Sequence, residues 1–146
     1  MIRWGGDEFL VVGRDVTRDA AELLAERIRT AVADLRIDVG SGNTAEIGCS
    51  LGYAFYPFMP SRPAAAPWMK VLAVADRALY VAKESGRGAW VGITSAGEGD
   101  AAEAIRKALE APEEAAREGA IILRQSSHGD AKTVDADLVS SSVGEQ

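Results

Sequence analysis

The residues best suited to chemistry stand near the start of the chain, in the stretch IRWGGDEFLVV (residues 2–12). Asp7 and Glu8 follow two glycines and precede an apolar run. Adjacent carboxylates supply the hard oxygen ligands that Mg²⁺ prefers, and a bound divalent cation neutralises and orients a phosphate. Gly5 and Gly6 let the backbone approach a bulky ligand and turn N–H groups toward phosphate oxygens. On spacing alone, an ordinary hairpin with a soluble acidic tip explains the same pattern.

A second group of candidates lies in ADRALYVAKESGRG (residues 75–88). Lys83 falls in the last turn of an expected helix, and Arg87 follows Gly86, which ends that helix. Two cations at this spacing can converge on one polyphosphate, and the guanidinium group adds a bidentate geometry. The alternative is that both cations simply complement the dipole at the helix C-terminus.

Two elements are expected to position the first group. Residues 1–14 are expected to form a β-hairpin, and its apolar run at 9–12 predicts a strand covered on both faces. A helix is expected to begin after Thr17, a typical N-cap residue. Its apolar positions recur at helical spacing and predict a buried stripe, formed by Ala20, Leu23, Leu24, Ile28, Ala31, Val32 and Leu35.

Three further elements are expected to position the second group. A turn at 40–44 precedes a strand over 47–56, whose glycines indicate close approach of a neighbouring element. A helix is expected from about Trp68 to Ser85, followed by a short strand at 89–93. Its predicted apolar face comprises Trp68, Val71, Leu72, Ala75, Leu79 and Ala82. The order of strands and helices predicts an α/β chain of the α+β sandwich kind, with one sheet and helices packed on it.

The composition changes after residue 94, and this change predicts three segments. Residues 1–94 are expected to form the domain. Residues 95–124 are rich in Ala and Glu, which predicts a helical appendage broken at Pro112, with a short strand at 120–124. From residue 125 to 146 Ser, Asp and Gly dominate, which predicts a disordered tail.

The overall composition excludes several classes of protein. The 146 residues are 47% hydrophobic and 26% charged, as in an ordinary soluble domain. A net charge of −6 argues against nucleic-acid partners and against broad binding to anionic membranes. The single cysteine excludes an internal disulfide and favours a reducing compartment. No apolar run approaches the roughly 20 residues that span a bilayer. We therefore expect a cytoplasmic chain, although a longer parent protein could be anchored in a membrane.

Taken together, RWGGDEF and ADRALYVAKESGRG resemble the two motifs of the GGDEF family of diguanylate cyclases. Between them, AELLAERIRTAV and CSLGYA resemble the helix and the S-x-G strand of that family, so the resemblance covers residues 2–93. It implies a nucleotidyl-cyclase-like fold with a central, mainly antiparallel sheet and packed helices. It also implies an enzyme that joins two GTP molecules into cyclic di-GMP and releases pyrophosphate, with Mg²⁺ or Mn²⁺ as cofactor.

The resemblance assigns roles to the four residues of the first motif. Gly5 and Gly6 match the glycines that lie against the bound nucleotide. Asp7 matches the acidic position that binds the divalent metals and is implicated in activating the attacking 3′-hydroxyl. Glu8 is the second acid of the motif, and we rank it below Asp7 as a catalytic and metal-binding residue.

Three basic residues receive roles in the same way. Lys83 and Arg87 match the pair that holds the terminal phosphates of the substrate. Arg27 falls where some members of the family place an arginine that binds inhibitory product. An ordinary solvated helix arginine is an equally good interpretation of Arg27.

The implied mechanism needs two domains, each holding one GTP, that meet as a homodimer. Each 3′-hydroxyl attacks the α-phosphorus of the opposite nucleotide, and positioning with charge neutralisation supplies most of the catalysis. A lone monomer is expected to bind GTP without completing the product.

The sequence also departs from the family. Members carry about half a domain before this hairpin, with another metal-binding Asp, a guanine-reading Asn/Asp pair and an R-x-x-D motif. We therefore expect an N-terminally truncated domain that forms little or no product alone. Gly88 stands where Asn is usual, and Gly48 where Thr is common. The alternative function is a non-catalytic module that binds GTP, cyclic di-GMP or partner proteins.

Overall fold

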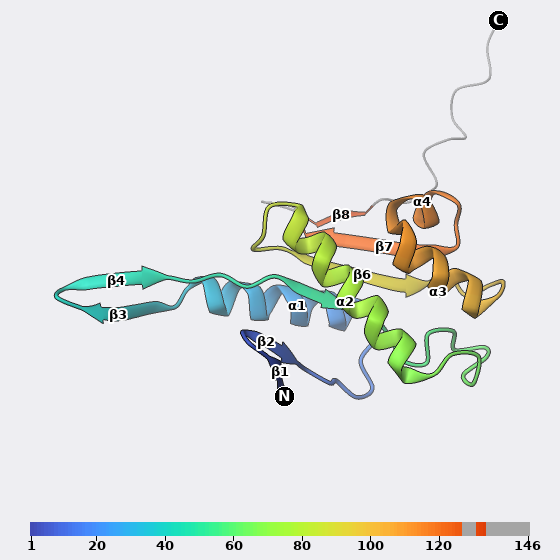
Figure 1. The fold of residues 1–146 in the computed structure, drawn as a ribbon, viewed down its shortest axis with the longest axis horizontal. Helices are drawn as coiled ribbons and strands as arrows, with labels where there is room; N and C mark the ends of the chain where they lie inside the picture. Colours follow the sequence, from blue (N-terminus) through green and yellow to red (C-terminus); the bar gives the residue numbers. More distant parts are fainter. Residues whose placement is uncertain (127–130, 134–146) are drawn as a thin grey trace, which may run out of the picture.

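The computed structural model describes residues 1–126 and 131–133, and the part of the chain that it describes contains helices and strands in the α+β arrangement expected (Figure 1). The elements in chain order are β1 Ile2–Gly5, β2 Glu8–Leu10, α1 Arg18–Ala33, β3 Arg36–Gly40, β4 Asn43–Glu46, β5 Leu51–Tyr53, α2 Trp68–Glu84, β6 Trp90–Ser95, α3 Ala101–Glu110, α4 Pro112–Arg117, β7 Ile121–Ser126 and β8 Ala131–Thr133.

The main sheet has the strand order β5-β6-β7-β8, and it is mainly antiparallel because only β5 and β6 run parallel. The expectation of one sheet is wrong, since β1-β2 and β3-β4 form two separate antiparallel hairpins (Figure 1). Each hairpin closes its ladder across a two-residue turn, a local pairing that carries little loop-closure entropy. The predicted turn at 40–44 therefore joins β3 and β4. Neither strand was predicted from the sequence.

Helix α2 lies against β5 at a distance that only a glycine in the strand allows. A Cβ at Gly52 would stand 2.2 Å from the Leu79 nitrogen and 2.3 Å from the Ala75 oxygen, both in the backbone of α2. A Cβ at Gly92, opposite Tyr53 in the ladder, would stand 2.1 Å from the Tyr53 ring. The expectation that glycines in this segment mark a close approach is confirmed at Gly52.

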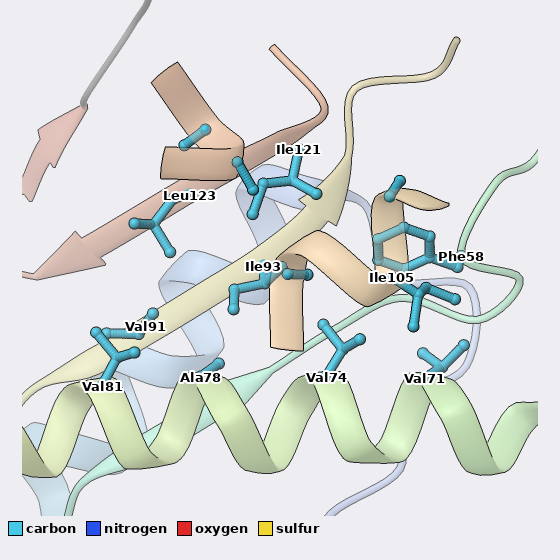
Figure 2. Packing of buried hydrophobic residues seen from close by; sticks show 14 of the residues in the cluster. Phe58, Val71, Val74, Ala78, Val81, Val91, Ile93, Ile105, Ile121 and Leu123 are labelled. Atoms are coloured by element: carbon cyan, nitrogen blue, oxygen red, sulfur yellow. The ribbon is translucent and has the colours of Figure 1, made fainter. Parts of the chain in front are cut away.

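The hydrophobic core fills the space between α2, the main sheet and the helices that follow. Figure 2 shows the side chains of α2 facing those of β6 and β7. The buried face of α2 consists of Val71, Val74, Ala78, Val81 and Ala82. It is rotated from the predicted face, because Ala75 and Leu79 lie beside Gly52 and Trp68 is 56% exposed.

The segment after residue 94 contributes to this same core. Asp100 caps α3 by accepting a hydrogen bond from the Ala102 N–H at 3.0 Å, and Pro112 begins α4, which confirms the predicted break. Side chains of α3, α4 and β7 join the cluster, namely Ala104, Ile105, Ala108, Ala115, Ala116, Ile121 and Leu123. Packing therefore continues past residue 94 without interruption.

Strand structure extends into the region where the composition predicts disorder. Residues 125 and 126 complete β7, and β8 pairs with it in an antiparallel ladder. The remainder of the predicted tail lies outside the described residues.

Helix α1 begins as predicted but does not bury its apolar stripe. The Thr17 hydroxyl accepts a hydrogen bond from the Ala20 N–H at 3.3 Å, which confirms the N-cap. Leu23 and Leu24 of the predicted stripe are 61% and 39% exposed, and Ala25 is the buried residue of the helix. The prediction that the stripe at 20–35 is buried is therefore wrong.

Polar contacts attach α1 to the main sheet instead. Arg18 donates to the Ser95 oxygen at 2.8 Å, and Arg124 of β7 pairs with Glu22 at 3.0 Å. The indole N–H of Trp90 donates to Glu26 at 3.0 Å. These three contacts lie at intervals of four residues, so they define the face of α1 that meets the sheet.

Most apolar residues at the first hairpin are also exposed, contrary to the prediction, and Leu10 is half-buried. Phe9 is 58% exposed and Val12 is 72% exposed. The cause is the pairing, because β1 and β2 bond to each other and not to the main sheet.

The contact at Gly52 predicts a large effect of one methyl group. Gly52→Ala is expected to lower the free energy of unfolding by about 1–3 kcal/mol, because backbone atoms of α2 must move. Chemical denaturation measures this change. Gly48→Ala is the matched control, since nothing lies within 4 Å of its added Cβ, and it should change stability by less than about 0.5 kcal/mol. Equal effects of the two substitutions would contradict the packing described.

Candidate functional site

The tip of the first hairpin carries the four residues of the first motif. Gly5 pairs with Glu8 across the ladder, which leaves Gly6 and Asp7 as the turn. Gly6 has a φ of +55°, a left-handed conformation that favours glycine. The Arg3 side chain donates to the Gly6 oxygen at 2.8 and 3.0 Å and so braces the turn. Nothing lies within 4 Å of a Cβ position at Gly5 or Gly6, so this backbone is open to a ligand.

An ion pair joins this tip to the end of α2. Lys83 Nζ lies 2.9 Å from Glu8 Oε1, and the two side chains are 42% and 40% exposed. The hydrogen bond to Glu8 raises the pKa of Lys83, and the carboxylates of Asp7 and Asp76 raise it further. The structure therefore brings residues of the two motifs, 75 positions apart, into direct contact.

The sign of this pKa shift sets the pH range of the contact. Because the pKa of Lys83 is raised in the folded chain, the stabilisation from its charge is complete below the ordinary lysine pKa. It disappears as the pH rises through the raised value. Lys83 thus stays charged at neutral pH.

Arg87 stands in an unusual loop directly after α2. Gly86, Arg87 and Gly88 have φ values of +115°, +62° and +63°. The left-handed conformation costs a non-glycine residue such as Arg87 roughly 1–2 kcal/mol. Glycine and asparagine adopt the left-handed conformation most readily. This explains why glycine can occupy position 88, where the resemblance described above leads us to expect asparagine. The Arg87 side chain is exposed and forms no ion pair within the described residues.

Arg27 lies away from these residues in the chain, on α1, and its side chain is exposed. No ion pair of Arg27 occurs in residues 1–126. Its role in product binding stays a prediction.

A divalent cation would find only part of its coordination shell at the hairpin. Within the described ranges, no group of three or more His, Cys, Asp or Glu side chains is placed to hold a metal ion. Asp7 and Glu8 offer carboxylates, and Glu8 already accepts from Lys83. Mg²⁺ commonly binds one or two carboxylates and completes its shell with waters and substrate phosphates. The donor set fits a metal shared with a nucleotide.

Two further residues of the site were not predicted from the sequence. Asp76 acts on Lys83 from two helical turns earlier, and a spacing of seven on a helix could have indicated it. Ser50 accepts a hydrogen bond from the Gly88 N–H at 3.2 Å, and no local pattern predicts such a contact across 38 positions.

Comparison with known proteins shows what the part of the chain that carries both motifs is similar to. Residues 1–89 match the sequence model described as "Diguanylate cyclase, GGDEF domain". The chain is 31% identical over 87 residues to "Diguanylate cyclase DosC" of Escherichia coli K12, which covers 60% of this chain and 18% of that protein. It is 40% identical over 85 residues to "Uncharacterized protein YhcK" of Bacillus subtilis 168, covering 58% and 22%.

A third relative bears a different name. The chain is 38% identical over 89 residues to "Cyclic di-GMP phosphodiesterase PdeR" of Escherichia coli K12, covering 60% of this chain and 12% of that protein. The chain thus spans about a fifth or less of the length of these three relatives.

No solved structure matches significantly. Among the described helices, none has the length and apolar character that a bilayer span requires.

The ion pair predicts a shift that NMR can measure. Glu8→Gln is expected to lower the pKa of Lys83 because the carboxylate no longer stabilises the ammonium group. A pH titration of ¹³C-methylated lysines follows each ammonium group. Glu118→Gln is the matched control. Glu118 is the chief cause of the raised pKa of Lys107, so this variant should lower the pKa of Lys107 and leave that of Lys83 unchanged. A Lys83 pKa that is the same with and without the Glu8 carboxylate would contradict the contact.

Proposed function

The chain belongs to the GGDEF family of diguanylate cyclase domains, and we propose that it takes part in condensing two GTP molecules into cyclic di-GMP with release of pyrophosphate, a reaction of which the chain alone is expected to perform little. Family and relatives support a role in cyclic di-GMP metabolism. The observation that carries the proposal is the contact between Glu8 and Lys83, because it assembles the acids of one motif and a cation of the other at one place. The proposal includes a cytoplasmic location, where GTP is available.

The side chains divide the work of binding the substrate. The open backbone at Gly5 and Gly6 lies against the nucleotide. Lys83 and Arg87 hold the terminal phosphates, Lys83 as a point charge and Arg87 through its bidentate fork. Asp7 stands at the tip of the turn, where its carboxylate can accept the proton of the attacking 3′-hydroxyl.

Asp7 and Glu8 would hold Mg²⁺ or Mn²⁺ together with oxygens of the bound nucleotide. When bound, the cation supplies charge neutralisation at the phosphates. To hold the cation, Glu8 would give up its contact with Lys83, and Lys83 would then be free to bind the phosphates. One rearrangement of the ion pair thus prepares both binding functions.

The reaction requires a second copy of the domain with its own GTP. The 3′-oxygen of one nucleotide forms a bond to the α-phosphorus of the other, and the bond from that phosphorus to pyrophosphate breaks. Two such steps close the cyclic product. A homodimer is therefore the proposed catalytic unit, and the rate of product formation should rise more steeply than the concentration of the chain.

A second candidate function is a non-catalytic module that binds GTP or cyclic di-GMP. It is favoured by the similarity to a protein named a phosphodiesterase and by the small number of carboxylates at the hairpin in the described part of the chain. Binding of GTP with no cyclic di-GMP at any chain concentration would support this alternative. Product formation that depends on Asp7 would support the cyclase.

The phosphate-binding role predicts the effect of removing each cation. Lys83→Ala and Arg87→Ala are each expected to weaken GTP binding by about tenfold or more, because each removes a charge-assisted hydrogen bond. Fluorescence titration with a labelled GTP analogue measures the dissociation constant. Lys70→Ala removes an exposed lysine near the start of the same helix, far from Lys83 along the chain, and should change the affinity by less than about twofold. A loss as large in Lys70→Ala would show that only the overall charge matters.

The metal-binding role predicts a different signature for Asp7. Asp7→Ala is expected to remove the enhancement of GTP binding by Mg²⁺, and any product formation that the unsubstituted chain shows should fall by about 100-fold or more. Titrations with and without Mg²⁺ measure the first effect, and chromatography of the nucleotides measures the second. Asp38→Ala is the control, because Asp38 lies on the β3-β4 hairpin and, within the described residues, its side chain accepts a hydrogen bond from the Gly40 N–H of the same strand. An unchanged response to Mg²⁺ in Asp7→Ala would rule out the metal role.

A further inference from the structure

Ser50 links the end of α2 to the start of β5. Its hydroxyl accepts a hydrogen bond from the Gly88 N–H at 3.2 Å, and the side chain is half-buried. At the next position the Leu51 N–H donates to the Ala89 oxygen at 2.9 Å. Two consecutive bonds therefore fasten the loop after α2 to the main sheet.

This loop has a conformation that needs fastening. Gly86, Arg87 and Gly88 all have positive φ values, and of the three only Arg87 carries a Cβ that opposes this conformation. A strained residue of this kind persists where the surrounding structure fixes it. The bond to Ser50 lies at the residue directly after Arg87.

Two other polar side chains near the loop, those of Ser85 and Arg87, form no hydrogen bond that holds it within the described residues. The Ser85 hydroxyl donates to the Ala82 oxygen at 3.1 Å, inside the last turn of α2. The Arg87 guanidinium makes no hydrogen bond within the described residues, so its own contacts do not hold the loop. Among the described residues, the bond from the Gly88 N–H to the Ser50 hydroxyl is a side-chain contact that does reach this loop.

We propose that Ser50 is a positioning residue for Arg87, and this proposal rests on the proposed function. Ser50 fixes the left-handed loop 86–88, and the loop directs the Arg87 fork toward the polyphosphate of GTP that Lys83 also binds. Ser50 does not touch the nucleotide. Its contribution to binding passes entirely through the side chain of Arg87.

A double-mutant cycle with GTP as the probe tests this route. Ser50→Ala is expected to weaken GTP binding about fivefold, the effect of one lost hydrogen bond. Arg87→Ala weakens it about tenfold or more, and the double variant should match Arg87→Ala within about twofold, because Ser50 has nothing left to position. Effects that multiply in the double variant would overturn the proposal, since a general loss of structure acts independently of Arg87.

Ser126→Ala provides a matched control. The Ser126 hydroxyl accepts from the Trp90 N–H at 2.9 Å, so this variant also removes a bond from a backbone N–H to a serine hydroxyl. It is expected to change GTP affinity by less than about twofold. A loss equal to that of Ser50→Ala would overturn the proposal.

Hydrogen exchange of the unsubstituted chain tests the loop without nucleotide and without a variant that must fold. The Gly88 amide is expected to exchange about tenfold or more slowly than the Gly86 amide, since Gly88 donates to Ser50 and Gly86 does not. Equal exchange at the two glycines would contradict the positioning role. Absence of GTP binding by the unsubstituted chain would contradict the proposed function, and the exchange measurement would still decide whether Ser50 fixes the loop.

Discussion

The approach of α2 to β5 at Gly52 is the constraint on which the rest of the structure depends. Because no side chain separates the helix backbone from the strand, α2 settles with one face in the core and its end beside the start of β5. That end carries Lys83 and the loop with Arg87, and Ser50 stands directly before β5. The glycine thus places a helix and, through it, the basic half of the candidate site.

The charges of the site act locally within an acidic chain. A net charge of −6 disfavours a polyphosphate at long range, so the attraction must come from cations placed at the point of contact. An exposed pair such as Glu8 and Lys83 contributes little to stability. Its value lies in geometry, because it orders Lys83 beside the hairpin before any ligand arrives.

Local patterns in the sequence were sufficient to predict most of the helices and turns. They were insufficient to predict which of these elements pack against one another. The hairpin at 2–10, the cap at Thr17, helix α2 and the break at Pro112 follow from turn chemistry, capping and periodicity. The stripe containing Leu23 and Leu24 shows the limit, because periodicity finds an apolar face without showing whether another element covers it. The candidate site shows the same difference between what the sequence predicts and what it does not. The motifs locate its acids and cations by residue type and spacing. The contacts that join distant positions, such as the bond from Gly88 to Ser50, depend on groups too common to identify such pairs in one sequence.

The polar attachment of α1 has a consequence for how the chain loses its order. Glu22 and Glu26 hold α1 to the sheet through single contacts, whereas α2, β6 and β7 share a continuous apolar cluster. Proteins open in cooperative units, and units with little buried apolar surface open first. We therefore expect the N-terminal third, including the first hairpin, to open before the remainder of the fold. The acids of the site lie on the segment expected to open first and Lys83 lies on the helix that packs in the core, so a ligand that binds both would hold the two segments together.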